Sequence, residues 1–396
     1  MFQDFLKYQA QTSPYPLGLE VSYAKGSYIY DTQNNKYLDF VAGVSACSLG
    51  HQHPRVNQAI IDQLNTYSHV MVYGEYAQHP AVAYCKLLVE NLHESLNKVY
   101  LVNSGTEATE GALKLARRVT GRSQLISCNN AYHGNTMGSM SVMGFEERKQ
   151  IFRPLIPDVD FITFNNEADL EKITTKTAGI ILESIQGGAG FIEPQNDFLV
   201  KVKKRCEEVG ALLIIDEIQP GFGRTGTLFG YENYNVVPDI VIIGKGMAGG
   251  MPVGGFIANE KYMDLLSHNP KLGHITTFGG HPVIAAACLA TLQEIIEKDY
   301  AKQSLEKEKL FRSLLVHPLI KEIRGRGLML AAMTESDTIT NEVILRCHKK
   351  GLVLFWLLFE GKAIRITPPL TISNEEIKKG CQIMLETLNE VQQEYK

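Results

Sequence analysis

Residues 239–255 read DIVIIGKGMAGGMPVGG, which places Lys245 directly after an apolar run and among glycines. A lysine in this setting predicts either a phosphate-gripping nucleotide loop or an amine that forms an imine with a carbonyl. The nucleotide loop requires GxxxxGK followed by Ser or Thr, but Gly246 follows here and Asp239 stands where the first glycine belongs. A strand buried on both faces ends at this lysine, and desolvation there lowers the pKa of an amine. We therefore expect Lys245 to form the imine.

A second ionisable residue ends another apolar run. Asp216 follows four apolar residues in LLIIDEIQ, 29 positions before Lys245 and about one βαβ unit away. A buried aspartate is costly unless a cation pairs with it, and the protonated pyridine nitrogen of a pyridoxal cofactor is such a cation. Local capping is the alternative. A metal site at Asp216 and Glu217 is disfavoured because no histidine lies near them in the sequence.

Two further stretches have residue types that suit a phosphate and a ring. Ser104, Gly105 and Thr106 stand between an apolar run and a helix-forming segment, where free N–H groups bind anions. An ordinary capped turn is the alternative there. In NNAYHGNTMG, Tyr132 beside His133 offers a flat face for stacking, although a loop aromatic packed in the core explains that stretch equally simply.

The histidines of GHQHP, His51 and His53, have the spacing of a metal-binding pair. Because Pro54 is suited to open a helix and no third ligand is evident, we expect a structural turn and no metal. The sequence contains no recognisable Ser-His-Asp, Cys-His or HExxH constellation and no glycine fingerprint of a dinucleotide fold.

Alternating elements must position these residues. Short apolar runs of β type alternate with amphipathic segments that end at glycine, a pattern typical of a mostly parallel sheet covered by helices. SYIYD and KYLDF, joined by TQNN, predict a hairpin near the N-terminus. Ser373 and Glu376 form a capping-box signature before a last amphipathic helix. The β-type runs are residues 98–104, 124–128, 160–164, 178–184, 211–217 and 239–245.

Composition narrows the classes of function. The 396 residues are 44% hydrophobic and 21% charged with a net charge of −4, so neither nucleic acid nor an anionic membrane is an expected partner. The longest apolar stretch, residues 352–359, is too short to span a bilayer, and the N-terminus lacks the features of a signal peptide. Seven cysteines, each at least 34 residues from the next, do not resemble a disulfide framework. We expect a cytoplasmic protein.

Together these motifs resemble the class III pyridoxal-phosphate aminotransferases, the family of acetylornithine, ornithine and 4-aminobutyrate aminotransferases. The likeness runs from GSYIYDTQNNKYLDFVAGV and LGHQHP to IRITPPL, in the family's order. It implies a homodimer of a transferase in which each active site receives a residue of the partner subunit. The resemblance implies these roles: Lys245 for the Schiff base and proton transfer, Asp216 for the pyridine nitrogen, Ser104, Gly105 and Thr106 for the phosphate, Tyr132 and His133 for the ring, Gln219 for the ring hydroxyl, Glu183 for cofactor binding, and Thr277 for the neighbouring subunit's phosphate.

The resemblance also implies the fold, the PLP-dependent transferase fold of type I. Its large α/β domain holds a mostly parallel seven-stranded sheet flanked by helices, and we expect it to comprise residues 54–285. A smaller α+β domain is expected from both chain ends, residues 1–53 plus 286–396.

Departures from the family pattern concern the substrate. The arginine that follows the stacking motif in the acetylornithine and ornithine branch, where it clamps a carboxylate, is Asn135 here. The glutamate that commonly pairs with a second arginine is Gly188, because EPIQGEGG reads ESIQGGAG. That second arginine remains as Arg365, so we expect it to bind the α-carboxylate of an amino acid or 2-oxo acid.

The resulting hypothesis is a ping-pong aminotransferase that moves a terminal or ω-amino group to a 2-oxo acid such as 2-oxoglutarate or pyruvate. Acetylornithine or ornithine aminotransferase proper stays open if another arginine replaces the missing clamp. A same-fold aminomutase, epimerase or decarboxylase is the further alternative.

Overall fold

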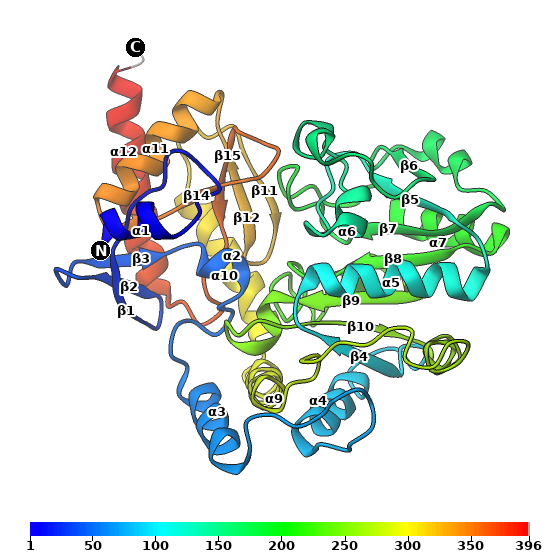
Figure 1. The fold of residues 1–396 in the computed structure, drawn as a ribbon. Coiled ribbons are helices and arrows are strands. Elements are labelled where there is room, and N and C mark those ends of the chain that lie inside the picture. Colours follow the sequence, from blue (N-terminus) through cyan, green and yellow to red (C-terminus); the bar gives the residue numbers. More distant parts are fainter. Residues whose placement is uncertain (395–396) are drawn as a thin grey trace.

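A computed structural model describes residues 1–394 and contains three sheets (Figure 1). The central sheet has seven strands in the order β4-β10-β9-β8-β7-β5-β6, and only β10 runs antiparallel to its neighbours. This confirms the predicted mostly parallel seven-stranded sheet. Its strands are β4 (Lys98–Val102), β5 (Gln124–Cys128), β6 (Val159–Ile162), β7 (Thr177–Glu183), β8 (Leu212–Asp216), β9 (Ile240–Gly244) and β10 (Gly254–Ala258).

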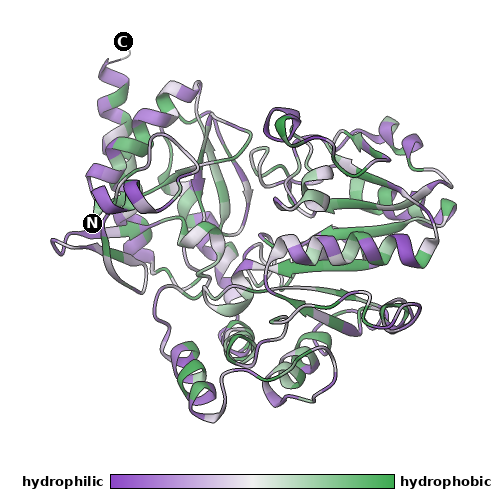
Figure 2. Ribbon diagram, viewed as in Figure 1, coloured by the Kyte–Doolittle hydropathy of each residue, from purple (hydrophilic) through white to green (hydrophobic). Residues whose placement is uncertain are grey.

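The central strands are apolar on both faces because helices cover both sides. Every residue of β7, β8, β9 and β10 is buried. Along β8, Ile214 belongs to the core beneath α5 (Gly105–Thr120), whereas Ile215 belongs to the core that contains α7 (Phe198–Val209). Neighbouring residues thus point to opposite faces, as strand geometry requires. Figure 2 shows the corresponding concentration of apolar residues along these strands.

The seventh strand, β10, was not among the six runs read from the sequence. Its two glycines break the apolar pattern, and Gly254 shows why they are needed. A Cβ at Gly254 would lie 2.1 Å from the backbone oxygen of Ser104, so only glycine allows β10 to pass the turn after β4.

Two four-stranded sheets lie with the chain ends beside the central sheet (Figure 1). The predicted hairpin is confirmed by antiparallel pairing of β2 and β3, and the capping box by reciprocal hydrogen bonds between Ser373 and Glu376. The division at residues 53/54 and 285/286 stays a prediction. The strands are β1 (Val21–Lys25), β2 (Tyr28–Asp31), β3 (Lys36–Asp39) and β13 (Leu352–Val353) in one sheet, and β11 (Glu322–Arg326), β12 (Met329–Met333), β14 (Phe355–Trp356) and β15 (Ala363–Ile366) in the other.

The remaining helices pack around these sheets, and α9 lies against α3 and α4. Among residues 1–394, no helix combines the length and apolar character needed to cross a bilayer. These helices are α1 (Phe2–Tyr8), α2 (Ala42–Ser45), α3 (Pro54–Thr66), α4 (His79–Val89), α6 (Met137–Ser141), α8 (Glu260–Met263), α9 (Pro282–Glu297), α10 (Tyr300–Leu314), α11 (Asp337–Lys349) and α12 (Asn374–Glu394), with 3-10 turns η1 (Glu146–Arg148), η2 (Gln150–Phe152), η3 (Glu167–Lys172), η4 (Gly230–Tyr234), η5 (Lys245–Ala248) and η6 (Asp264–Ser267).

Candidate active site

The predicted site residues gather at one edge of the central sheet. Ser104 follows β4, Glu183 ends β7, Asp216 ends β8 and Lys245 follows β9, while His133 lies in the loop after β5. These strands all run parallel, so their carboxyl ends meet at the same edge. In open α/β sheets ligands bind at that edge.

Lys245 begins the 3-10 turn η5 with a φ of 43°, a left-handed conformation that is costly for a residue with a side chain. Burial lowers the pKa of Lys245 to about 8, and the positive charge of Arg365 acts in the same direction. Asp216 opposes this shift in pKa. The lower pKa increases the fraction of free amine near neutral pH, and imine formation and proton transfer both require that form.

Asp216 and His133 form a buried pair. Nδ1 of His133 lies 2.7 Å from Oδ2 of Asp216, and Oδ1 of Asp216 accepts a hydrogen bond from the backbone N–H of Ile218 at 2.9 Å. The backbone oxygen of His133 accepts a hydrogen bond from Oγ1 of Thr109, which fixes the loop. Nε2 of His133 is buried without a partner among residues 1–394. The Asp216 carboxylate could pair with a protonated ring nitrogen. The unpartnered Nε2 of His133 is consistent with a polar ligand that binds at this site.

The turn after β4 leaves anion-binding groups free. Oγ of Ser104 caps α5 by accepting from the N–H of Glu107 at 3.3 Å. The N–H groups of Gly105 and Thr106 make no hydrogen bond to the described part of the chain. A Cβ at Gly105 would lie 2.7 Å from Cδ1 of Ile218, so the backbone runs close to its neighbours. This helix start fits a phosphate.

The Thr106 side chain has partners of its own. Its Oγ1 lies 2.7 Å from Oγ of Ser139 and accepts the backbone N–H of Asn135 at 3.2 Å. The hydroxyl therefore ties the start of α5 to the loop that carries the stacking motif. Thr106 can offer a phosphate its backbone N–H without breaking these bonds.

Glu183, Tyr132 and Gln219 complete the inner part of the site. Oε1 of Glu183 accepts from the N–H of Gly187 at 2.9 Å, and burial raises the pKa of Glu183 to about 7. The N–H of Tyr132 points to Oε2 of the same carboxylate at 3.5 Å. Nε2 of Gln219 donates to Oγ of Ser45 at 3.3 Å, which links the site to the N-terminal part of the chain.

Arg365 reaches the site from β15 and has no acidic partner among residues 1–394. Its side chain is 4% exposed, Nε donates to the Trp356 carbonyl at 3.3 Å, and Nη1 is buried without a partner among the described residues. Burial lowers the pKa of Arg365 to about 10. At Gly188, a Cβ would lie 2.7 Å from Cδ2 of Phe359. An aromatic ring thus packs where the side chain of a glutamate would begin.

The other two predicted residues lie nearer the surface. Asn135 and Thr277 are both exposed. The segment of Thr277 borders β4, because Oγ1 of Thr276 accepts from Nδ2 of Asn103 at 2.8 Å. Exposed apolar side chains accompany this segment, namely Val70, Met71, Tyr73, Tyr76, Leu272, Ile275 and Phe278.

Sequence reasoning gave no role to Arg224, a fully buried arginine in GFGRTG. Its Nη1 donates to the carbonyls of Leu328 and Pro368 at 2.9 and 3.0 Å, whereas Nη2 has no partner in the described part of the chain. The charge of Arg224 also lowers the pKa of Lys245, although by less than burial or the charge of Arg365 does. The sequence feature that could have drawn attention to Arg224 is its place among glycines, shortly after the IIDEIQ motif.

The two histidines of GHQHP lie in a turn before α3, and their neighbours are protein groups. Nε2 of His51 lies 2.9 Å from Oδ2 of Asp39, and hydrogen bonding to that carboxylate raises the pKa of His51 to about 9. His53 immediately precedes α3, which begins at Pro54 as predicted.

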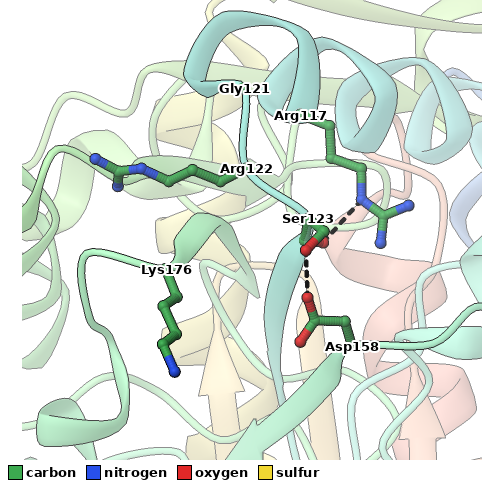
Figure 3. Close-up of a pocket in the computed structure, with 6 residues that line it drawn as sticks. All are labelled: Arg117, Gly121, Arg122, Ser123, Asp158 and Lys176. Carbon is green, nitrogen blue, oxygen red and sulfur yellow. Dashed lines mark hydrogen bonds between the residues drawn. The ribbon is translucent and has the colours of Figure 1, made fainter.

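A hollow of about 560 Å³ lies at the opposite, amino edge of the sheet (Figure 3). Its two arginines are engaged with backbone oxygens: Nε of Arg117 donates to the Ser123 carbonyl, and Nη1 of Arg122 donates to those of Thr177, Val209 and Gly210. These contacts hold loops together. None of the predicted site residues lines this hollow.

Known proteins match the chain over almost its whole length. The family model for class-III aminotransferases matches residues 8–388. The acetylornithine aminotransferase of Caldanaerobacter subterraneus is 36% identical, with 93% of this chain and 94% of that protein covered. The [LysW]-aminoadipate semialdehyde/glutamate semialdehyde transaminase of Sulfolobus acidocaldarius is 34% identical, with 95% and 96% covered. The structure of an ornithine aminotransferase from Toxoplasma gondii, described with partial occupancy of PLP at its active site, superposes with a TM-score of 0.92 at 30% identity, covering 99% and 94% of the two chains.

The sheet, the carboxyl-edge site and these likenesses define a pyridoxal-phosphate-dependent transferase of α/β fold. The chain belongs to the class III aminotransferases. It is therefore a transaminase whose cofactor is pyridoxal phosphate, and its substrates are an amino donor and a 2-oxo acid.

Proposed function

We propose that this transaminase moves a terminal or ω-amino group from an amine or amino acid to a 2-oxo acid such as 2-oxoglutarate or pyruvate. The proposal rests mainly on the surroundings of Arg365. Its side chain is buried, its Nη1 has no partner among residues 1–394, and glycine occupies position 188, where the family commonly has a glutamate that pairs with this arginine. A buried guanidinium without a carboxylate is costly, so its retention is best explained by a ligand that brings the carboxylate. A 2-oxo acid or an α-amino acid does so.

Residues at the carboxyl edge would hold the cofactor. The N–H groups of Gly105 and Thr106 would receive its phosphate, and Tyr132 would stack on its ring. Asp216 would pair with the ring nitrogen, and Gln219 would bind the ring hydroxyl. Ser104, His133 and Glu183 support these residues by capping α5, orienting Asp216 and fixing the loop of Tyr132.

Bound pyridoxal phosphate supplies an electron sink that stabilises negative charge on the carbon bearing the amine. Lys245 would hold the cofactor in the resting enzyme, and its free amine would be the group that moves a proton during the exchange of the amino group. Its pKa of about 8 suits both steps of this transfer. Asp216, oriented by His133, would favour the protonated form of the ring nitrogen.

Asn135 supports the ω-amino half of the proposal. Its amide cannot make the bidentate, charge-assisted contact that an arginine makes with a carboxylate. The donor is therefore a compound whose binding does not depend on an arginine at that position. Acetylornithine aminotransferase proper is the second candidate, because relatives of that name are about one-third identical to this chain.

We also propose a homodimer in which Thr277 reaches the partner's phosphate site. Thr277 is exposed, and the apolar side chains around its segment would be covered by a second copy. Seven free cysteines support a cytoplasmic location, where thiols stay reduced.

A half-reaction screen tests the proposal: purified, cofactor-loaded enzyme is mixed with single donors and the absorbance of the cofactor is followed. Terminal amines and ω-amino acids should convert the cofactor, and a 2-oxo acid should restore it. Lys245→Ala should abolish both conversions. Rapid conversion by N-acetylornithine together with inert simple ω-amino donors would replace the proposal by the second candidate. Loss of the donor's carboxyl group or rearrangement of its skeleton would instead indicate a decarboxylase or aminomutase.

A further inference from the structure

Asn135 stands at the position where related enzymes have an arginine that binds a carboxylate, so this position supplies no positive charge to the outer part of the site. The backbone N–H of Asn135 donates to Thr106, but its side chain makes no hydrogen bond to the described residues and is exposed. A donor carrying a carboxylate far from its amine would find no charged partner at this position. Another residue must supply one if such donors are bound.

Arg148, the last residue of η1, is held in place across two segments. Its Nη2 donates to the Leu358 carbonyl at 3.0 Å, and its guanidinium carbon lies 5.6 Å from the ring centroid of Phe359. Phe359 in turn stacks on Phe145, with centroids 4.5 Å apart and ring planes 19° apart. These contacts fix the direction of an exposed side chain, because the guanidinium lies on an aromatic face and donates at one edge.

The same aromatic residue places Arg148 beside the site. Phe359 packs against Gly188, in the loop that follows β7, and its N–H donates to the Gly188 carbonyl at 2.9 Å. The charge of Arg148 also reaches Tyr132, where it opposes the rise in the pKa of the phenol that burial causes. Arg148 therefore lies on the side of the site bounded by Tyr132 and Gly188.

The charge of Arg148 is not paired with any carboxylate that the structure describes. It forms no ion pair with a carboxylate of residues 1–394, whereas Arg153, five residues further on, holds Glu146 through bonds of 2.8 and 2.9 Å. One hydrogen bond to Leu358 leaves most of the guanidinium donors free. A stacked, singly bonded arginine presents its other edge for a bidentate contact with a carboxylate.

We propose that Arg148, stacked on Phe359, binds the distal carboxylate of the amino donor in place of the arginine missing at position 135. The donor class is then an ω-amino acid, with its amine at Lys245 and its carboxylate at Arg148. This inference rests on the proposed function and narrows its substrate class.

The test compares two donors of equal chain length, 5-aminopentanoate and pentylamine, which differ by the carboxylate. In a Lys245→Ala background loaded with pyridoxal phosphate, their Kd values follow from the cofactor's absorbance without turnover. Arg148→Gln should raise the Kd of 5-aminopentanoate about tenfold and leave that of pentylamine within about twofold, as expected for one charge-assisted contact. Arg148→Lys keeps the positive charge, so it should raise the Kd of 5-aminopentanoate by less than Arg148→Gln does.

Arg153→Gln is the matched control, because Arg153 is an arginine of the same segment that is paired with Glu146. It should alter neither Kd. Equal changes for both donors in Arg148→Gln, or no change for either, would overturn the proposal. If the active enzyme takes nitrogen from neither compound, the ω-amino function fails, while the ratio of the two Kd values still decides the role of Arg148.

Discussion

Replacing Arg365 by methionine should stabilise the protein while removing its ability to bind a 2-oxo acid. The guanidinium is buried, has no acidic partner in the described part of the chain and stays charged below pH about 10. Methionine fills a similar volume without charge, and replacing buried ions with apolar side chains is often stabilising. A residue kept at a cost to stability is expected to serve the substrate.

The structure gives the size of both effects. Burial lowers the pKa of Arg365 from its ordinary value to about 10, and at about 1.4 kcal/mol for each unit of pKa this corresponds to a penalty of about 3 kcal/mol. The substitution also loses the bond to the Trp356 carbonyl and the contact with the Phe191 ring, together worth about 1–2 kcal/mol. The free energy of unfolding should therefore rise by about 1–2 kcal/mol. Loss of a charge-assisted carboxylate contact should lower kcat/KM for the 2-oxo acid by about 100-fold or more.

Urea unfolding at fixed protein and cofactor concentrations measures the first effect, and steady-state kinetics with a varied 2-oxo acid measures the second. Arg365→Lys is the control: it keeps a buried charge but loses the planar fork, so it should lose acceptor affinity without gaining stability. A methionine variant that is less stable than the wild type would refute the unpaired-charge argument. An unchanged kcat/KM would refute the role in acceptor binding.

Three further predictions follow from the site and its surroundings. Because burial lowers the pKa of Lys245 to about 8, the rate at which cofactor-free protein takes up pyridoxal phosphate should rise as pH rises through about 8, measured by absorbance; a midpoint near 10 would contradict the burial argument. Gly188→Glu should destabilise the protein by about 1–3 kcal/mol in urea unfolding, because its Cβ meets Phe359. Phe359→Ala should restore much of that loss, and strict additivity of the two changes would speak against the clash. Phe278→Asp should yield monomers in sedimentation experiments, whereas Val316→Asp, at an apolar residue 76% exposed elsewhere, should not; dimers that survive Phe278→Asp would exclude this surface as the interface.

The sequence indicated six strands of the central sheet and the ionisable residues at the ends of two of them. Six strands of the central sheet were readable because burial on both faces requires unbroken apolar runs, and the helices α5 and α7 between them end at Gly121 and Gly210. Lys245 and Asp216 were readable for the same reason, since an ionisable residue at the end of a buried run stands out. The seventh strand escaped this reasoning because Gly254 has to avoid the Ser104 carbonyl, a contact between distant residues.

Only the tertiary structure decided which charges are paired. The family resemblance singles out Arg365 for a carboxylate, but residue type alone does not distinguish Arg117 from Arg148. In the fold, Arg117 is engaged with a backbone carbonyl, Arg365 is buried with no carboxylate partner among residues 1–394, and Arg148 lies on an aromatic ring beside the site. The ring is that of Phe359, 211 positions from Arg148 in the sequence. Pairing, burial and pKa depend on neighbours brought together across such separations, so residue type and local spacing cannot specify them.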